Sequence, residues 1–108
     1  EKRFNWELVY CELYAGGKYK NIDSKILLTR TMELLRNKGY ELCNADMTIC
    51  AERPKLNPHI PLMQETLAQV MNVDIDTLSI KATTTEKLGF TGREEGISAY
   101  AVVLITQQ

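Results

Sequence analysis

The chain has 108 residues, of which 44% are hydrophobic and 25% are charged, and its formal net charge is -1. A chain of this size is expected to form a single domain, spanning residues 1–108, that buries about two-thirds of its unfolded surface. The near-neutral charge argues against binding nucleic acid through a broad basic surface. No apolar run approaches the length of a membrane span, so we expect no membrane partner either.

The first half of the chain contains two predicted strands with a helix between them. Residues 6–14 are rich in aromatic and aliphatic side chains, which is typical of a strand. A helix is predicted to begin at a cap, Asp23 or Ser24, and to end near Asn37, just before a glycine. Residues 42–52 alternate apolar and polar side chains, which predicts a half-buried strand.

The second half continues the alternation of helices and strands. Two prolines predict a loop over residues 53–58, and a helix is expected from Pro61 to about Met71. A third strand is predicted over residues 78–84, followed by a glycine-rich loop, and residues 97–106 are predicted to form a final, largely buried strand. This order of elements predicts an α/β sandwich with helices on one face of a mixed β-sheet.

The three cysteines, Cys11, Cys43 and Cys50, are odd in number and form no CxxC pair. Cys43 and Cys50 are seven residues apart in one predicted strand, so their side chains should point to opposite faces. We interpret all three as reduced structural thiols rather than as redox or zinc-binding groups.

Residues 81–96, KATTTEKLGFTGREEG, carry the strongest chemical information in the sequence. The hydroxyls of Thr83, Thr84 and Thr85 are short donors close to backbone N–H groups, which suits phosphate oxygens. Glu86 adds a carboxylate of the kind that Mg²⁺ uses when it also contacts substrate phosphates. The glycines that follow allow a ligand to approach the backbone closely. These features predict a loop that binds a polyphosphate.

The same run resembles the signature of the 2-C-methyl-D-erythritol 2,4-cyclodiphosphate synthase family. Residues 45–63, ADMTICAERPKLNPHIPLM, resemble that family's strand, nucleotide loop and following helix. The likeness extends from about Tyr19 to the C-terminus, whereas residues 1–17 match nothing in the family. Taken singly, the threonine triplet, the prolines and the charged residues are more simply explained by strand propensity, loop geometry and solvation. Two motifs in the family's order and spacing outweigh those explanations.

The resemblance implies a phosphorus–oxygen lyase of the non-mevalonate isoprenoid pathway. Its substrate would be 4-diphosphocytidyl-2-C-methyl-D-erythritol 2-phosphate, and its products 2-C-methyl-D-erythritol 2,4-cyclodiphosphate and CMP. Because the substrate carries its own nucleophile, the protein is expected to position the substrate and to neutralise charge as it moves.

The resemblance also assigns roles to individual residues. Thr84 and Glu86 are implied in catalysis, and Glu86 would bind magnesium or manganese at the diphosphate. A further group is implied to line a central cavity of the assembly, although structural and functional interpretations are evenly balanced for its members, Phe90, Arg93 and Glu95. The residues implied to bind cytidine and phosphate are Ala51, Pro54, Lys55, Leu56, Ala82, Thr83 and Thr84.

The family also uses zinc, held by an Asp-x-His and by a second histidine in a His-Ser-Asp-Gly-Asp stretch. Neither motif occurs in this chain. Its one histidine, His59, matches a family histidine that is not a zinc ligand. An alternative therefore stays open, in which the chain is a truncated or catalytically impaired homologue that keeps only a trimeric module for binding cytidine nucleotides.

Assembly and location are implied by the resemblance as well. Family members are homotrimers in which the sheets surround a central axis and the active sites lie between neighbouring subunits. The pathway operates in bacteria and plastids, so the expected compartment is the bacterial cytoplasm or the plastid stroma.

Overall fold

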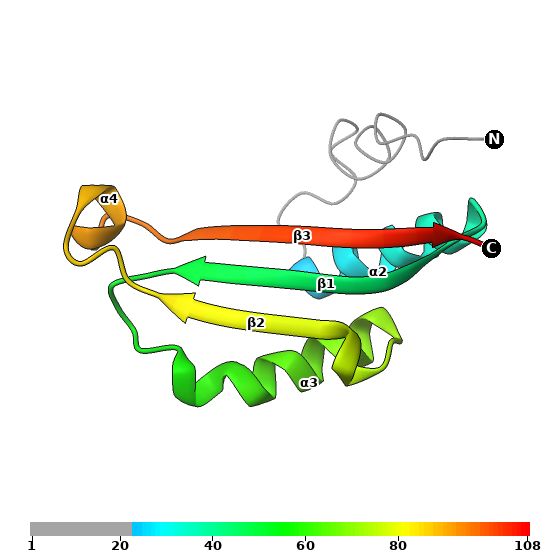
Figure 1. The fold of residues 1–108 in the computed structure, drawn as a ribbon, viewed down its shortest axis with the longest axis horizontal. Helices are drawn as coiled ribbons and strands as arrows, with labels where there is room; N and C mark the ends of the chain where they lie inside the picture. The colour runs from blue at the N-terminus through cyan, green and yellow to red at the C-terminus, as the bar shows by residue number, and fades with distance from the viewer. Residues whose placement is uncertain (1–22) are drawn as a thin grey trace. The chain divides into compact units, whose positions relative to one another are not determined.

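The computed structural model describes residues 23–108. Three strands form one sheet in the order β2-β1-β3, where β1 is Tyr40–Cys50, β2 is Leu78–Thr83 and β3 is Ser98–Gln107. β1 and β2 are parallel, and Figure 1 shows β3 running in the opposite direction. The predicted α/β class and mixed sheet are therefore confirmed. The strand predicted over residues 6–14, like Cys11, lies outside the described residues.

The chain divides into two compact units, Glu1–Glu41 with Thr106–Gln108, and Leu42–Ile105. The described part of the first unit contains helix α2, Ser24–Asn37, whose bounds agree with the prediction. The Asp23 carboxylate caps the helix by accepting a hydrogen bond from the Lys25 backbone N–H at 2.9 Å. Gly39 follows the helix with a positive φ of 85°, a conformation that glycine adopts without strain.

The second unit has its core between helix α3, Ile60–Met71, and strand β2. Ala68 and Met71 of the helix are buried, as are Leu78 and Ile80 of the strand. The Gln64 amide on α3 reinforces this packing because it donates to the Leu78 carbonyl at 2.7 Å. The helix ends at Asn72, whose left-handed conformation (φ 54°) stops it where the sequence predicted.

Short helical turns flank α3 and interrupt the glycine-rich loop. The turn η2, Asn57–His59, leads into α3, and η3, Ile75–Thr77, leads from it into β2. A single turn, α4, Gly89–Gly92, lies within the segment that was predicted to be a loop. The prediction of a continuous loop there is therefore wrong.

Strand β3 differs from its prediction in burial rather than in position. Its bounds are within one residue of the predicted 97–106, yet Tyr100, Val102, Val103 and Leu104 are all exposed, Val102 to 73%. The prediction of a largely buried strand is wrong for the single chain. β3 lies at the edge of the sheet, and no element in residues 23–108 covers these side chains.

None of the helices that the structure describes has the length and apolar character needed to cross a membrane.

Candidate functional site

A pocket of about 530 Å³ lies at the carboxyl ends of the parallel strands β1 and β2. The two strands end side by side, with Cys50 paired to Thr83, and the Ala51 N–H extends the pairing by donating to the Thr83 carbonyl at 3.0 Å. The carboxyl ends of parallel strands are the usual position for ligand sites in open α/β sheets. The lining residues are Ala51, Glu52, Pro54, Lys55, Leu56, Asn57, Pro58, Ala82, Thr83 and Thr84.

All seven residues predicted to bind cytidine and phosphate line this one pocket. They come from two segments that are about thirty residues apart in sequence and that the parallel pairing of β1 and β2 brings together. Sequence reasoning missed Glu52, Asn57 and Pro58. Their position within the predicted nucleotide loop, between or beside the predicted residues, was the information that would have identified them.

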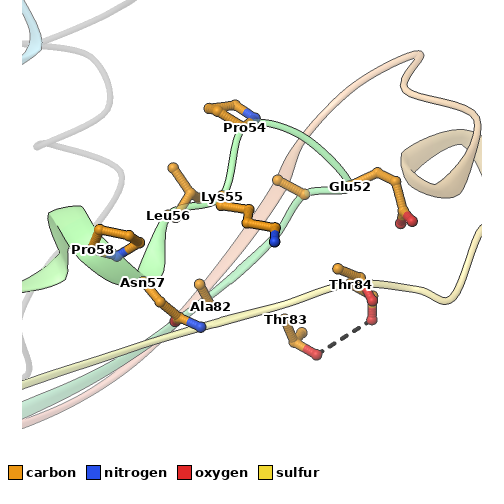
Figure 2. Close-up of a pocket in the computed structure, with 10 residues that line it drawn as sticks. Glu52, Pro54, Lys55, Leu56, Asn57, Pro58, Ala82, Thr83 and Thr84 are labelled. Atoms are coloured by element: carbon orange, nitrogen blue, oxygen red, sulfur yellow. Dashed lines mark hydrogen bonds between the residues drawn. The ribbon is translucent and has the colours of Figure 1, made fainter.

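The pocket combines apolar walls with hydrogen-bond donors. Pro54, Leu56 and Ala82 supply apolar surface, while Lys55 and the threonines supply an ammonium group and hydroxyls. Figure 2 shows the Lys55 side chain extending from the loop toward the strand that carries Thr83. Such a surface can accept both a flat, partly apolar ring and an anionic group.

Glu52 is the unexpected member of the lining. Its Oε2 atom is buried and has no hydrogen-bond partner within the described residues. A buried carboxylate oxygen without a donor is unfavourable, and no contact among the described residues offsets this cost.

The segment after β2 is a tight turn held by threonine hydroxyls. Thr85 donates through its hydroxyl to the Leu88 carbonyl at 2.6 Å, and the buried Thr91 hydroxyl donates to Thr85 Oγ1 at 3.1 Å. The turn is so tight at Gly92 that a Cβ atom there would lie 2.2 Å from the Lys87 carbonyl carbon. This geometry explains the glycine at position 92.

Glu86 lies in this turn rather than in the lining of the pocket. It is exposed, it has a left-handed φ of 53°, and its backbone N–H donates to Thr84 Oγ1 at 3.4 Å. Within residues 23–108 its carboxylate makes no hydrogen bond or ion pair. The side chain is thus available two residues from Thr84 of the pocket, and its role as a metal ligand stays a prediction.

The residues predicted for the central cavity cluster on α4 and the turn after it. The Arg93 Nε atom lies 2.6 Å from Glu95 Oε1, and the Glu95 N–H donates to the Phe90 carbonyl at 2.9 Å. Phe90 itself is exposed. The three residues therefore form one local unit in the chain, and what that unit faces in an assembly stays a prediction.

No group of three or more histidine, cysteine, aspartate or glutamate side chains in residues 23–108 could hold a metal ion. Cys43 and Cys50 both lie in β1 as predicted and are free thiols, Cys43 being exposed.

The fold and the pocket together define an α/β protein with a cavity of about 530 Å³ at the ends of two parallel strands. A sequence model of the YgbB family matches residues 13–106, and the chain belongs to this family. A relative from Parabacteroides distasonis is 78% identical over 91 residues, which are 84% of this chain and 56% of the relative. One from Bacteroides thetaiotaomicron is 74% identical over 84% of this chain and 57% of the relative.

Both relatives are named 2-C-methyl-D-erythritol 2,4-cyclodiphosphate synthase, which confirms the resemblance inferred from the two motifs. This chain spans little more than half the length of these curated relatives, 56% of the first of them.

Solved structures share the fold. The CDP complex of IspF from Plasmodium falciparum superimposes with a TM-score of 0.79 at 26% identity, over 92% of this chain and 60% of that one. The bifunctional IspDF from Campylobacter jejuni gives a TM-score of 0.80 at 37% identity, over 91% of this chain and 27% of that one.

Proposed function

We propose that this protein acts as a 2-C-methyl-D-erythritol 2,4-cyclodiphosphate synthase, a lyase of isoprenoid biosynthesis by the non-mevalonate route. The observation that carries the proposal is the single pocket that gathers all seven residues predicted for cytidine and phosphate. Relatives of that name at 78% and 74% identity support the activity. The CDP bound in the Plasmodium falciparum structure supports a cytidine nucleotide as the ligand.

In the proposed reaction an oxygen of the substrate's 2-phosphate attacks the β-phosphorus of its own diphosphate. The bond between that phosphorus and the oxygen shared with the α-phosphorus breaks, CMP leaves with the shared oxygen, and a cyclic diphosphate remains. No protein nucleophile is needed, so the contribution of the chain is to hold the substrate in line and to stabilise the moving charge.

The pocket residues divide this work between them. Pro54 restricts the backbone of the loop that would lie against the cytosine. The N–H and C=O groups of the neighbouring loop residues are therefore held in place before the ligand binds. The Lys55 ammonium and the hydroxyls of Thr83 and Thr84 would bind the phosphates as donors. The interaction of these donors with the phosphates would strengthen as negative charge develops on the leaving CMP.

Glu86 is the residue proposed to hold the divalent ion. A carboxylate is a hard oxygen ligand of the kind that Mg²⁺ and Mn²⁺ prefer, and this one is exposed and unpaired within the described residues, close to Thr84. A bound ion would neutralise part of the diphosphate charge. Zinc is different, because residues 23–108 hold no set of ligands that fits it, and no step is assigned to it.

A homotrimer with the sheets around a central axis and the helices outside is part of the proposal. The exposed apolar side chains of β3 support it, because a surface of this kind is more stable when another subunit covers it. In that assembly Phe90, Arg93 and Glu95 would line the central cavity. The bacterial origin of the relatives supports the bacterial cytoplasm as the compartment.

Calorimetric titration of CDP into the purified protein, with and without magnesium, tests the site. We expect saturable binding that magnesium strengthens, and Lys55→Ala should weaken it about tenfold or more, since hydrogen bonds to charged groups are strong. Lys38→Ala removes an equal charge far along the sequence from the pocket segments and serves as the control. Absence of CDP binding to the folded protein would overturn the proposal. Metal-dependent release of CMP from the full substrate then separates the enzyme from a module that only binds.

A further inference from the structure

An ion pair joins the nucleotide loop, residues 51–58, to the turn that follows α4. The Arg53 Nε atom lies 3.1 Å from Glu94 Oε1, and the two side chains are 79% and 47% exposed. Arg53 stands between Glu52 and Pro54, which both line the pocket. Glu94 follows α4 in the turn that also contains the Arg93–Glu95 pair. The contact therefore connects the wall of the pocket to a segment that is about forty residues away in sequence.

Apart from this ion pair, few interactions hold the middle of the nucleotide loop, residues 52–55, in place. At its start the Ala51 N–H donates to the Thr83 carbonyl, and at its end the His59 N–H donates to the Leu56 carbonyl. Between these bonds, residues 52–55 make no backbone hydrogen bond with any other described residue. The Arg53 side chain supplies a polar tie at the centre of this stretch.

Glu94 occupies a backbone conformation that favours glycine. Its φ is 64°, in the left-handed region, where a side chain with a Cβ atom is strained. Its neighbours Arg93 and Glu95 pair with each other, so the Glu94 side chain is the one in this charged run that reaches the nucleotide loop. A strained non-glycine residue that makes a contact between two loops is a candidate for a functional role.

We propose that the Arg53–Glu94 pair acts as a clasp that holds the nucleotide loop in its binding conformation. The inference rests on the proposed cytidine nucleotide site and makes Arg53 and Glu94 positioning residues for it. An exposed ion pair contributes little to the stability of a whole fold. Here it acts on a loop with few bonds of its own, so its effect falls on the preorganisation of the pocket and hence on affinity.

A double-mutant cycle tests the clasp. Four proteins are compared: the parent, Arg53→Gln, Glu94→Gln and the double variant. The affinity of each for CDP and for uncharged cytidine is measured. Each single change should weaken both ligands about two- to fivefold, the range that an exposed pair can supply, and the double variant should be no weaker than either single variant. Cytidine carries no phosphate, so a loss of its affinity cannot arise from long-range attraction for an anion.

Two further measurements separate positioning from simple stability. Glu94→Gly removes the pair and also relieves the left-handed strain, so the thermal stability should stay equal or rise while the affinity for cytidine falls. Backbone amide exchange at Lys55 and Leu56 should accelerate in Glu94→Gln even without nucleotide. Glu33→Gln, which breaks the exposed Arg30–Glu33 pair on α2, is the matched control. It should change neither the affinity for cytidine nor the amide exchange at Lys55 and Leu56.

The outcomes distinguish this inference from the proposed function. Parent protein that binds CDP, together with variants of unchanged affinity or purely additive losses, would overturn the clasp and leave the nucleotide site intact. Failure of the parent itself to bind CDP or cytidine would overturn both. Coupled losses of affinity with faster exchange in the loop would support the clasp.

Discussion

The two strands that flank β1, β2 and β3, differ sharply in how much of their apolar surface is buried. β2 packs against α3, and its Leu78 is only 3% exposed, whereas Val102 of β3 is 73% exposed. β2 also contributes residues to the pocket, so the pocket is built on the strand that packs against a helix of the same chain. The comparison indicates that contacts within one chain hold the residues that line the pocket, whereas no element within residues 23–108 covers the apolar side chains of β3.

The largest expected effect tests this contrast directly. Leu78→Ala should lower the free energy of unfolding by about 2–5 kcal/mol, because it leaves a cavity between β2 and α3. Val102→Ala, the matched change on β3, should cost less than about 0.5 kcal/mol in the separated chain. Urea unfolding measures both. A large, concentration-dependent loss for Val102→Ala would show that a partner covers β3, and a large loss in the monomer would contradict the exposed edge.

Gly92→Ala should have the next largest effect. The added Cβ would lie 2.2 Å from the Lys87 carbonyl carbon, so the turn after β2 must shift, at a cost of about 1–3 kcal/mol. Gly89→Ala is the control, because a Cβ there meets open space and only the positive φ of 69° opposes it. Thermal unfolding compares the two variants. Equal stability of Gly92→Ala and the parent would contradict the tight turn.

Glu86→Gln tests the metal proposal through affinity. Loss of the carboxylate should weaken magnesium-dependent binding of CDP about tenfold, whereas the affinity for CMP should be nearly unchanged. Glu65→Gln, which changes an exposed carboxylate on α3, is the control. Identical affinities of Glu86→Gln and the parent for CDP in magnesium would rule out Glu86 as a ligand.

Asp23 is expected to give the smallest effect, confined to acid. The hydrogen bonds from the Lys25 backbone N–H and side chain lower the pKa of the Asp23 carboxyl in the folded protein. The cap therefore stabilises α2 fully above the usual aspartate pKa of about 3.9, and this contribution is lost as the pH falls through the lower folded value. Asp23→Asn should retain the cap without that acid dependence. Circular dichroism during acid titration of both proteins provides the measurement, and identical acid transitions would contradict it.

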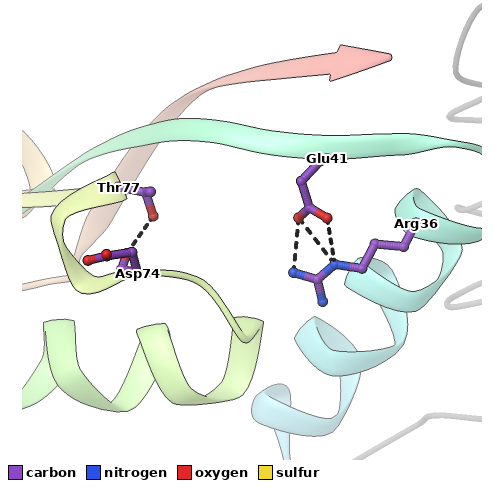
Figure 3. Close-up of polar contacts among 4 residues, drawn as sticks. All are labelled: Arg36, Glu41, Asp74 and Thr77. Carbon is purple, nitrogen blue, oxygen red and sulfur yellow. Dashed lines mark hydrogen bonds and ion pairs between the residues drawn. The ribbon is translucent and has the colours of Figure 1, made fainter. Parts of the chain in front are cut away.

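Features set by neighbouring residues could be predicted from the sequence. Asp23 marks the start of α2, and Asn72 marks the end of α3, because each acts within its own turn. Figure 3 shows two contacts of the same local kind: the Thr77 hydroxyl donates to the Asp74 carbonyl at 2.7 Å, and Arg36 pairs with Glu41 at 3.1 Å. Seven of the ten residues that line the pocket were also predicted, because the resemblance of two motifs to a known family implied them.

Features that depend on distant contacts were not predicted. The turn α4 begins and ends with glycines, which disfavour a helix, and it is supported by a contact between the hydroxyls of Thr91 and Thr85 that no sequence pattern indicated. The exposure of β3 depends on what lies beside the edge of the sheet, which the apolar pattern of one strand does not specify. The buried Glu52 Oε2 and the Arg53–Glu94 pair likewise follow from the placement of whole loops.

Within residues 23–108, β3 is an uncovered edge strand, and this feature also has a consequence for the handling of the protein. From Ser98 to Gln107 the strand contains neither a charged residue nor a proline, the two features by which natural edge strands discourage unwanted pairing. The net charge of -1 provides little repulsion between molecules near neutral pH. Solubility should therefore depend on β3, and a lysine introduced at its outward positions should delay precipitation of the isolated chain more than one introduced on α3.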